Sequence, residues 1–427
     1  MRRASVLWEV YVTRFEDALE RYRKRRLTGE EAGELLGMSG RNFRRLVVRY
    51  DEDGADGLRD LRLGKPSPKR APAAELTRMQ RLYQERYRGM NVKHFHEHLV
   101  ERHGYKLGYT VTRLALQAAG LVRRATRRGV HRQKRERRPL PGMLLFQDGS
   151  THRWLPGIEQ DLDLIVTLDD ATGAIYSAFL VEEEGTMSSF LGLIETIGAQ
   201  GLFGAFYTDR GSHYFHTPQA GGQVDKTRPT QVGRALAQLG ITHIPSYSPE
   251  ARGRMERVFG TLQGRLPHEL RLAEIATIAA ANRFLKERFV PDYNRRFAVP
   301  AAEAGTAFLP YAGRPLEDVL CVQQDRQVGR DNCVKWNGRS LQIPPQRHRH
   351  HYVKATVRVH EYPDGRLAIF DGPRPLASFD PEGRPIDASR AAQLRSAATA
   401  CGFVDNTPAL PTTPQAQQQQ QRTFDVL

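Results

Sequence analysis

The stretch "DLDLIVTLDDATGAIYSAFLVEEE" at residues 161–184 decides the fold of the central part of the chain. Two apolar runs flank the turn-forming segment from Asp169 to Gly173, which predicts two antiparallel strands joined as a hairpin. The stretch before it, "GMLLFQDGSTHRWL" (142–155), reads as another strand. Three successive strands predict a meander that opens a sheet.

The residues after the hairpin alternate between helix and strand patterns. These patterns are a helix in "TMSSFLGLIETIGAQ" (186–200), a strand in "GAFYTDRGSHY" (204–214), a helix in "TQVGRALAQLG" (230–240), a short strand in "ITHIP" (241–245) and a helix after Pro249. The order βββαβαβα across residues 140–305 predicts a mixed α/β sheet with helices packed on it. In such a sheet the first and fourth strands can lie side by side.

The last of these helices lies in "SYSPEARGRMERVFGTLQGRL" (246–266), where Glu256 stands among arginines. Its apolar residues recur at helical spacing and form one stripe: Met255, Val258, Phe259, Leu262 and Leu266. The stripe should face a core, which leaves Glu256 at the edge between interior and solvent. The simplest interpretation is a surface helix in which Glu256 pairs with Arg252, a contact worth about 0.2–0.5 kcal/mol.

Residues 1–70 contain a helix-turn-helix pattern in "TGEEAGELLGMSGRNFRRLVVRY" (28–50). Thr28 and Glu31 form a capping box, and Ser39 can cap the second helix after a tight turn. That helix carries polar residues suited to the major groove of DNA: Arg41, Asn42, Arg44 and Arg45. The first 70 residues are therefore predicted to be a DNA-binding domain.

Residues 71–121 predict a second helix-turn-helix DNA-binding domain. Asn91 is a suitable N-cap, Gly120 is a suitable residue after a helix end, and Arg113 is a candidate DNA contact. The three histidines His94, His96 and His98 occupy alternate positions, which point to different faces of a helix, and no cysteine is near. A zinc site is therefore not expected.

The charge of the chain indicates a nucleic-acid partner. The 64 Lys and Arg against 48 Asp and Glu give a formal net charge of +16 and a pI near 10.0. The basic run "VRRATRRGVHRQKRERRP" (122–139) cannot pack against itself and predicts a linker that lies along phosphates. Its candidate contacts include Arg123, Arg124, Arg127 and Arg128. The alternative is a linker that only keeps the protein in solution.

Short strands with Asn-Gly and Asp-Gly turns predict a small β-barrel at residues 315–385. Residues 386–427 are low in complexity and are expected to be disordered. No apolar run reaches 18 residues, and the first residues lack the apolar core of a signal peptide. These features predict a cytoplasmic, nucleoid-associated protein without a membrane partner.

Three carboxylates occupy comparable places in the predicted sheet. Asp148 lies on the first strand, Asp209 at the end of the fourth and Glu256 on the following helix. Clustered carboxylates repel one another unless cations neutralise them, and Mg²⁺ or Mn²⁺ prefers such oxygen ligands. Two such ions can stabilise both the attacking and the leaving oxygen of a phosphoryl displacement. The residues therefore predict cleavage and transfer of phosphodiesters.

The motifs "FQDGS", "YTDRGSHY" and "SPEARGRMERVFGTLQ", in this order, resemble those of the DDE transposases and retroviral-type integrases. The flanking modules are similar to those of bacterial insertion-sequence transposases. The resemblance implies an RNase H-like catalytic core at 140–305, with Asp148, Asp209 and Glu256 as a catalytic triad that binds two Mg²⁺ or Mn²⁺ ions. It also implies that arginines beside the glutamate hold DNA: Arg252, Arg254 and Arg257.

Two features depart from that family pattern. The 46 residues between Asp209 and Glu256 exceed the spacing common in many relatives, and the loop at 216–230 accounts for the excess. The His-His-Cys-Cys zinc module of retroviral integrases is absent, which again speaks against zinc.

The resemblance implies a transposase that binds the terminal inverted repeats of its element, cleaves there and joins the 3′-OH ends to target DNA. A homodimer or larger oligomer on double-stranded DNA is expected, because two ends must be joined together. Two alternatives remain open. One is a DNA-binding regulatory or architectural protein with an inactive core, and the other is a structure-specific nuclease.

Overall fold

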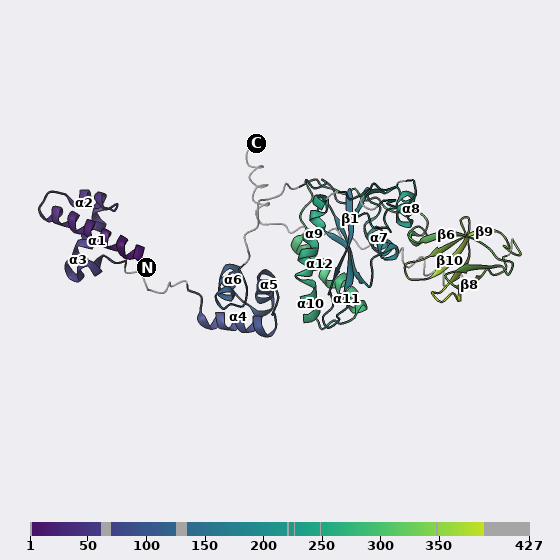
Figure 1. Ribbon diagram of the computed structural model, residues 1–427, viewed down its shortest axis with the longest axis horizontal. Coiled ribbons are helices and arrows are strands. Elements are labelled where there is room, and N and C mark those ends of the chain that lie inside the picture. The colour runs from purple at the N-terminus through teal and green to yellow at the C-terminus, as the bar shows by residue number, and fades with distance from the viewer. Residues whose placement is uncertain are drawn as a thin grey trace, which may run out of the picture. The chain divides into compact units, whose positions relative to one another are not determined.

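The computed structural model forms two compact units, Met1–Arg81 and Leu82–Leu427 (Figure 1). The structure describes residues 2–60, 70–124, 135–219, 222–225, 227–247, 249–346 and 349–387, and the side chains of these except at 2–6 and 249–252. Most of the predicted basic linker and all but two residues of the predicted tail lie outside these ranges. None of the described helices has the length and apolar character needed to cross a membrane.

The first unit begins with the helices α1 (Arg2–Arg23), α2 (Gly29–Leu35) and α3 (Gly40–Asp53), followed by the short 3-10 helix η1 (Gly54–Leu58). The predicted caps are confirmed. The Thr28 hydroxyl accepts from the backbone of Glu31, the Glu31 carboxylate accepts from the backbone of Thr28 at 2.7 Å, and Ser39 caps α3. The apolar faces of the three helices meet in a core that includes Phe15, Ala32, Phe43 and Leu46. Whether the pair α2 and α3 reads DNA stays a prediction.

Three further helices follow, α4 (Ala73–Glu85), α5 (Val92–His103) and α6 (Tyr109–Ala118). Asn91 caps α5 by accepting from the backbone of His94 at 2.9 Å, as predicted. Gly120 has a φ of +68° just after α6, which confirms its predicted role at the helix end. Phe95 packs against the rings of Tyr83 and Tyr87 and holds α5 in place.

The central sheet has the strand order β3-β2-β1-β4-β5. Its strands are β1 (Leu144–His152), β2 (Leu162–Asp169), β3 (Ile175–Val181), β4 (Ala205–Thr208) and β5 (Thr242–Pro245). The first three strands form an antiparallel meander, whereas β4 runs parallel to β1 and β5 runs parallel to β4. The predicted mixed sheet, its element order and the contact between the first and fourth strands are confirmed.

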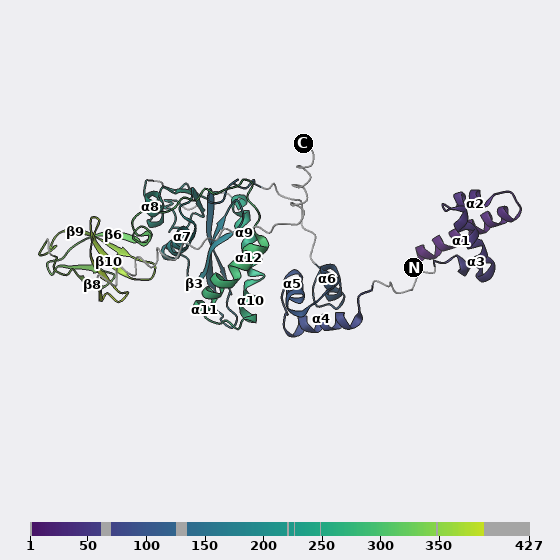
Figure 2. The same cartoon turned by 180° about the vertical axis from the view of Figure 1, so that it is seen from behind.

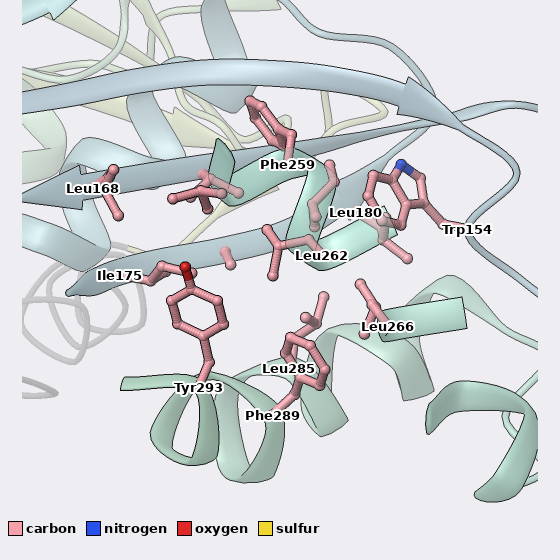
Figure 3. Close-up of a cluster of buried hydrophobic side chains, with 14 of the residues drawn as sticks. Trp154, Leu168, Ile175, Leu180, Phe259, Leu262, Leu266, Leu285, Phe289 and Tyr293 are labelled. Atoms are coloured by element: carbon pink, nitrogen blue, oxygen red, sulfur yellow. The ribbon is translucent and has the colours of Figure 1, made fainter. Parts of the chain in front are cut away.

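Helices cover both faces of this sheet (Figures 1 and 2). One face packs against α9 (Pro249–Gln263), α10 (Leu266–Leu272), α11 (Ile278–Phe284) and α12 (Val290–Phe297), and the other against α7 (Thr186–Gln200) and α8 (Gln231–Gln238). Alternation along β1 supplies both cores, because Leu144 and Phe146 point to the first face and Leu145 to the second. Figure 3 shows the first core, where Phe259 and Leu262 of α9 lie against the strands.

The C-terminal strands form an open sheet and a separate hairpin. The strands are β6 (Val322–Gln327), β7 (Cys333–Trp336), β8 (Arg339–Gln342), β9 (Thr356–Glu361), β10 (Leu367–Asp371), β11 (Arg374–Phe379) and β12 (Pro385–Ile386). Within the described residues the sheet order is β12-β11-β10-β9-β6, and β7 pairs with β8 alone, so the predicted barrel is not closed. Trp336 and Leu341 of the hairpin share a core with Val359 and Ile369 of the sheet. Face-to-face packing buries these residues without closure.

Candidate active site

Asp148 lies on β1, and Asp209 lies directly after β4, the parallel strand that pairs with β1. Phe146 of β1 is paired with Tyr207 of β4, and each aspartate lies two residues beyond its member of this pair. Both Phe146 and Tyr207 belong to the core under α9. Because side chains two residues apart share a face of a strand, Asp148 lies on the α9 side of the sheet with Phe146, and Asp209 follows directly after the end of β4.

Glu256 lies on α9, the helix that covers this same face. Its neighbours Met255 and Val258 are buried in the shared core, whereas Glu256 itself is exposed at the flank, as the helical stripe predicts. Two turns further along, Gln263 Nε2 donates to Ser150 Oγ at 3.1 Å. Ser150 lies two residues beyond Asp148, on the same face of β1. The flank of α9 that carries Glu256 and Gln263 therefore lies over the face of β1 that carries Asp148 and Ser150.

The hydroxyl of Tyr214 lies within electrostatic range of Asp148 and Asp209 at this end of the sheet. Burial raises the pKa of Tyr214 well above its usual value, and negative charge on Glu184, Asp209 and Asp148 raises it further. The hydroxyl donates to Gln147 Oε1 at 2.9 Å, next to Asp148 in the chain. Three carboxylates therefore act electrostatically on one buried group at the carboxyl ends of β1 and β4.

Glu184 is a further acid near this end of the sheet, and sequence reasoning did not single it out. It precedes α7, and its carboxylate fills the space beside Gly149, where an added Cβ would meet Glu184 Oε2 at 2.2 Å. Glu184 Oε1 lies 3.6 Å from His213 Nε2, and His213 contacts the loop that follows Asp209. The glycine after Asp148 was the available signal, because a strand glycine often marks a close approach of another group.

Asp169 and Asp170 lie in the hairpin turn, as predicted, but both are fully buried. Asp170 forms ion pairs with Arg135 and with Arg254 of α9. The Asp170 carboxylate also accepts from the backbone of Arg138 at 2.7 Å. Arg254, a predicted DNA contact, is therefore engaged inside the protein, where its side chain is only 14% exposed.

The other predicted DNA contacts fall in three groups. Those on the exposed surface are Arg41, Arg44, Arg45, Arg123, Arg124 and Arg257, and Asn42 and Arg113 are half-buried. Arg44 pairs with Glu30 at 3.0 Å, and Arg45 donates to Asn42 at 2.8 Å. Arg127 and Arg128 lie outside the described residues, as does the side chain of Arg252, so the alternative pairing of Glu256 with Arg252 stays open.

The residue types at this end of the sheet suit a hard divalent cation, although the ligand atoms of Asp148, Asp209 and Glu256 are not gathered at one point in the described structure. Asp148, Asp209 and Glu256 offer carboxylate oxygens, which Mg²⁺ and Mn²⁺ prefer over nitrogen or sulfur. Asp209 Oδ1 already accepts from the backbone of Gly211 at 2.9 Å, a contact that fixes the orientation of the carboxylate. Carboxylates of this kind bind phosphate oxygens only through such cations.

Comparison with solved structures gives weak overall superpositions. The HTLV-2 integrase catalytic core domain in complex with magnesium is 17% identical, covering 34% of this chain and 83% of that chain, with a TM-score of 0.26. A simian T-cell lymphotropic virus intasome in complex with PP2A regulatory subunit B56 gamma is 14% identical, covering 68% and 91%, with a TM-score of 0.30. The strand order β3-β2-β1-β4-β5 defines the fold of the central sheet.

Comparison with curated proteins is more informative. No family model matches the chain. The y4bF protein of Sinorhizobium fredii (strain NBRC 101917 / NGR234), named as a transposase, is 34% identical over 349 residues, which are 81% of this chain and 75% of that protein. The transposase for insertion sequence IS1202 of Streptococcus pneumoniae is 28% identical, covering 61% of this chain and 63% of that protein. The chain therefore belongs to the family of insertion-sequence transposases.

Proposed function

We propose that this transposase binds the terminal inverted repeats of its element, cleaves the DNA ends and transfers their 3′-OH groups into target DNA. Asp148, Asp209 and Glu256 form the catalytic triad. The observation that supports the proposal is the parallel pairing of β1 with β4, whose last pair, Phe146 with Tyr207, comes two residues before each aspartate on a sheet that packs against the helix of Glu256. Family membership supplies the reaction class.

The triad would hold two Mg²⁺ or Mn²⁺ ions through its carboxylate oxygens. When bound, such ions supply Lewis-acid stabilisation of the attacking and leaving oxygens of the phosphate. The protein's own contribution is placement. The paired strands fix Asp148 and Asp209, and the packing of Met255 and Phe259 fixes the position of Glu256 on α9.

DNA binding is assigned to separate surfaces of the chain. In the first unit, α3 exposes Arg41, Arg44 and Arg45, which suits a helix that enters the major groove. The second helical segment contributes Arg113, and the basic linker at 122–139 contributes contacts to phosphates that do not depend on sequence. On α9, Arg252 and Arg257 would hold DNA beside Glu256, whereas Arg254 is engaged by Asp170. The C-terminal strands would add phosphate contacts.

The test uses a labelled duplex taken from the DNA that flanks the gene, incubated with Mg²⁺ and the full chain. Nicking at a repeat end followed by joined products is expected from the wild-type protein. The Glu256→Gln variant should bind the same duplex and form neither product. Glu250→Gln serves as the matched control, since Glu250 lies near the start of the same helix and should be dispensable.

Two other results would replace the proposal. If both proteins bind the ends and neither cuts them, the chain acts as a DNA-binding regulator or architectural protein with an inactive core. If the wild-type protein cleaves without joining and shows no preference for repeat ends, the chain is a structure-specific nuclease. Size measurement on DNA should show a dimer or larger assembly, because two ends must be brought together.

A further inference from the structure

Two histidines of α5 and one glutamate of α10 bring three donor atoms to a common point. His94 Nε2 lies 2.7 Å from Glu269 Oε1, His98 Nε2 lies 2.8 Å from the same oxygen, and the two nitrogens are 3.2 Å apart. The two histidine side chains are buried, with exposures of 3% and 5%, and Glu269 is half-buried, with an exposure of 17%. These residues are distinct from the carboxylates of the proposed active site.

Local structure explains why the two histidines meet. His94 and His98 are four residues apart, so they project from the same face of α5. His96, between them in sequence, points elsewhere and contacts Thr112 Oγ1 at 3.3 Å. The expectation that these histidines lie on different faces therefore holds for His96. It was wrong for His94 and His98, which are one helical turn apart. Glu269 reaches them because its neighbour Leu270 is buried in the sheet core.

Hydrogen bonds alone satisfy this triangle of atoms poorly. If both Nε2 atoms carry hydrogen, two donors crowd the same oxygen with their nitrogens only 3.2 Å apart. If only His98 carries hydrogen there, the lone pair of His94 Nε2 faces a carboxylate oxygen at 2.7 Å. A cation between the three atoms makes every contact attractive. The Nδ1 atoms of both rings are buried without a partner among the described residues, so Nε2 is the atom at which each ring is held.

The arginines near this cluster contact atoms other than Glu269 Oε1. Arg265 and Arg296 both pair with Glu97, at 2.7 and 2.8 Å. Arg102 lies 3.8 Å from Glu269 Oε2, the oxygen that does not face the histidines. Glu269 Oε1 therefore remains directed at the two imidazole nitrogens.

We propose that His94, His98 and Glu269 bind a zinc ion, with water completing the ligand set, and that this ion fastens α5 to α10. Two imidazole nitrogens and one carboxylate oxygen are typical zinc donors, and they disfavour Mg²⁺ and Ca²⁺, which take oxygen ligands. Zinc bonds of about 2.05 Å in a tetrahedron separate ligand atoms by about 3.3 Å. The observed separations are slightly shorter, so the three side chains move apart by about half an ångström on binding.

The first measurement is metal content. The full chain is expressed without a polyhistidine tag, carrying Asp148→Asn and Asp209→Asn so that the carboxylate triad cannot retain zinc, and is dialysed against metal-free buffer. Elemental analysis should find about one zinc per chain. His94→Gln/His98→Gln should reduce this at least tenfold, whereas the matched control His96→Gln should leave it unchanged. Equal zinc content in the double histidine variant and the control would overturn the proposal.

A second measurement covers the case in which the double histidine variant does not fold. The chain with its histidines intact is stripped with a chelator and titrated with Co²⁺, which should give visible absorption bands that Zn²⁺ then displaces. Adding Zn²⁺ should also raise Tm by at least ~3 °C, since an ion that binds only the folded state stabilises it. A folded chain that shows neither the bands nor the rise in Tm refutes the site.

Discussion

Two pairs of aspartates on adjacent strands of the central sheet have opposite surroundings. Asp169 and Asp170 at the end of β2 are fully buried and meet hydrogen-bond donors or arginines, including Arg254 and Arg135. Asp148 on β1 and Asp209 directly after β4 lie at the same end of the sheet as a third acid, Glu184, and all three act on Tyr214. The difference shows that residue type alone does not set the surroundings of a carboxylate. The neighbours supplied by packing do.

The largest expected effect tests the catalytic side of this comparison. Asp148→Asn or Asp209→Asn should lower strand joining by about 10³-fold, equivalent to ~4 kcal/mol of transition-state stabilisation, because a neutral amide holds a divalent cation poorly. Thermal stability should stay the same or rise, since one of two neighbouring like charges is removed. Joining rates and Tm are measured on the same preparations. Activity within tenfold of wild type would contradict the assignment.

For Asp170, which is buried in ion pairs, we expect a substitution to lower the stability of the fold. Asp170→Asn should destabilise the fold by about 3–5 kcal/mol, because it leaves Arg254 buried beside the turn without its charge partner. Asp170→Leu combined with Arg254→Met should recover much of that loss, since the pair is replaced by apolar contacts. Urea unfolding of the three proteins measures this. If Asp170→Asn unfolds with the same free energy as wild type, the ion pair contributes nothing to the fold.

Gly149, next to Asp148 on β1, leaves room for the carboxylate of Glu184. Gly149→Ala should destabilise the chain by about 1–3 kcal/mol, because the new methyl group would meet Glu184 Oε2 at 2.2 Å. Gly260→Ala on α9, where no atom lies within 4 Å, should instead stabilise it by about 0.5–1 kcal/mol.

Removing the obstructing carboxylate provides the control for this prediction. Glu184→Ala should restore stability to the Gly149→Ala protein, because it empties the space that the methyl group enters. Thermal unfolding of the single and double variants decides the matter. Loss of stability that persists in the double variant would mean that Glu184 is not the obstacle.

The smallest effect comes from the C-terminal sheet, where Asp318 accepts from Tyr362 at 2.6 Å and His360 lies beside it. Burial, followed by the positive charges of Arg234, Arg314 and Arg358, lowers the pKa of His360 to about 3. Below about pH 6.5 the unfolded chain takes up a proton that the folded chain excludes. Stability should therefore fall as pH drops from 6.5 towards 3, by about 1.4 kcal/mol at pH 5.5.

His360→Gln should remove this share of the pH dependence. Urea unfolding at pH 7.5 and pH 5.5 measures it, and the difference between the two pH values should shrink by about 1.4 kcal/mol in the variant. The variant's stability at pH 7.5 supplies the baseline, so any packing loss at that position is separated from the proton effect. An unchanged pH difference would show that His360 titrates normally in the folded protein.

The sequence by itself determined the local elements of this protein. The capping box of Thr28 and Glu31, the cap at Asn91 and the turn from Asp169 to Gly173 each involve atoms a few residues apart. Hydrophobic periodicity then predicted the order of strands and helices, because a helix or strand that buries one face repeats its apolar residues at its own structural period. From that order followed the adjacency of the strands that carry Asp148 and Asp209.

Only the tertiary structure decided which distant side chains meet. Asp170 pairs with Arg254, 84 positions away in the sequence, and His98 contacts Glu269, 171 positions away. The C-terminal strands likewise form an open sheet with a packed hairpin, where the sequence predicted a closed barrel. Such choices depend on the relative placement of whole elements, which is set by packing across cores. Local hydrogen bonds and residue spacing act over one or two helical turns and carry no information about partners at that separation.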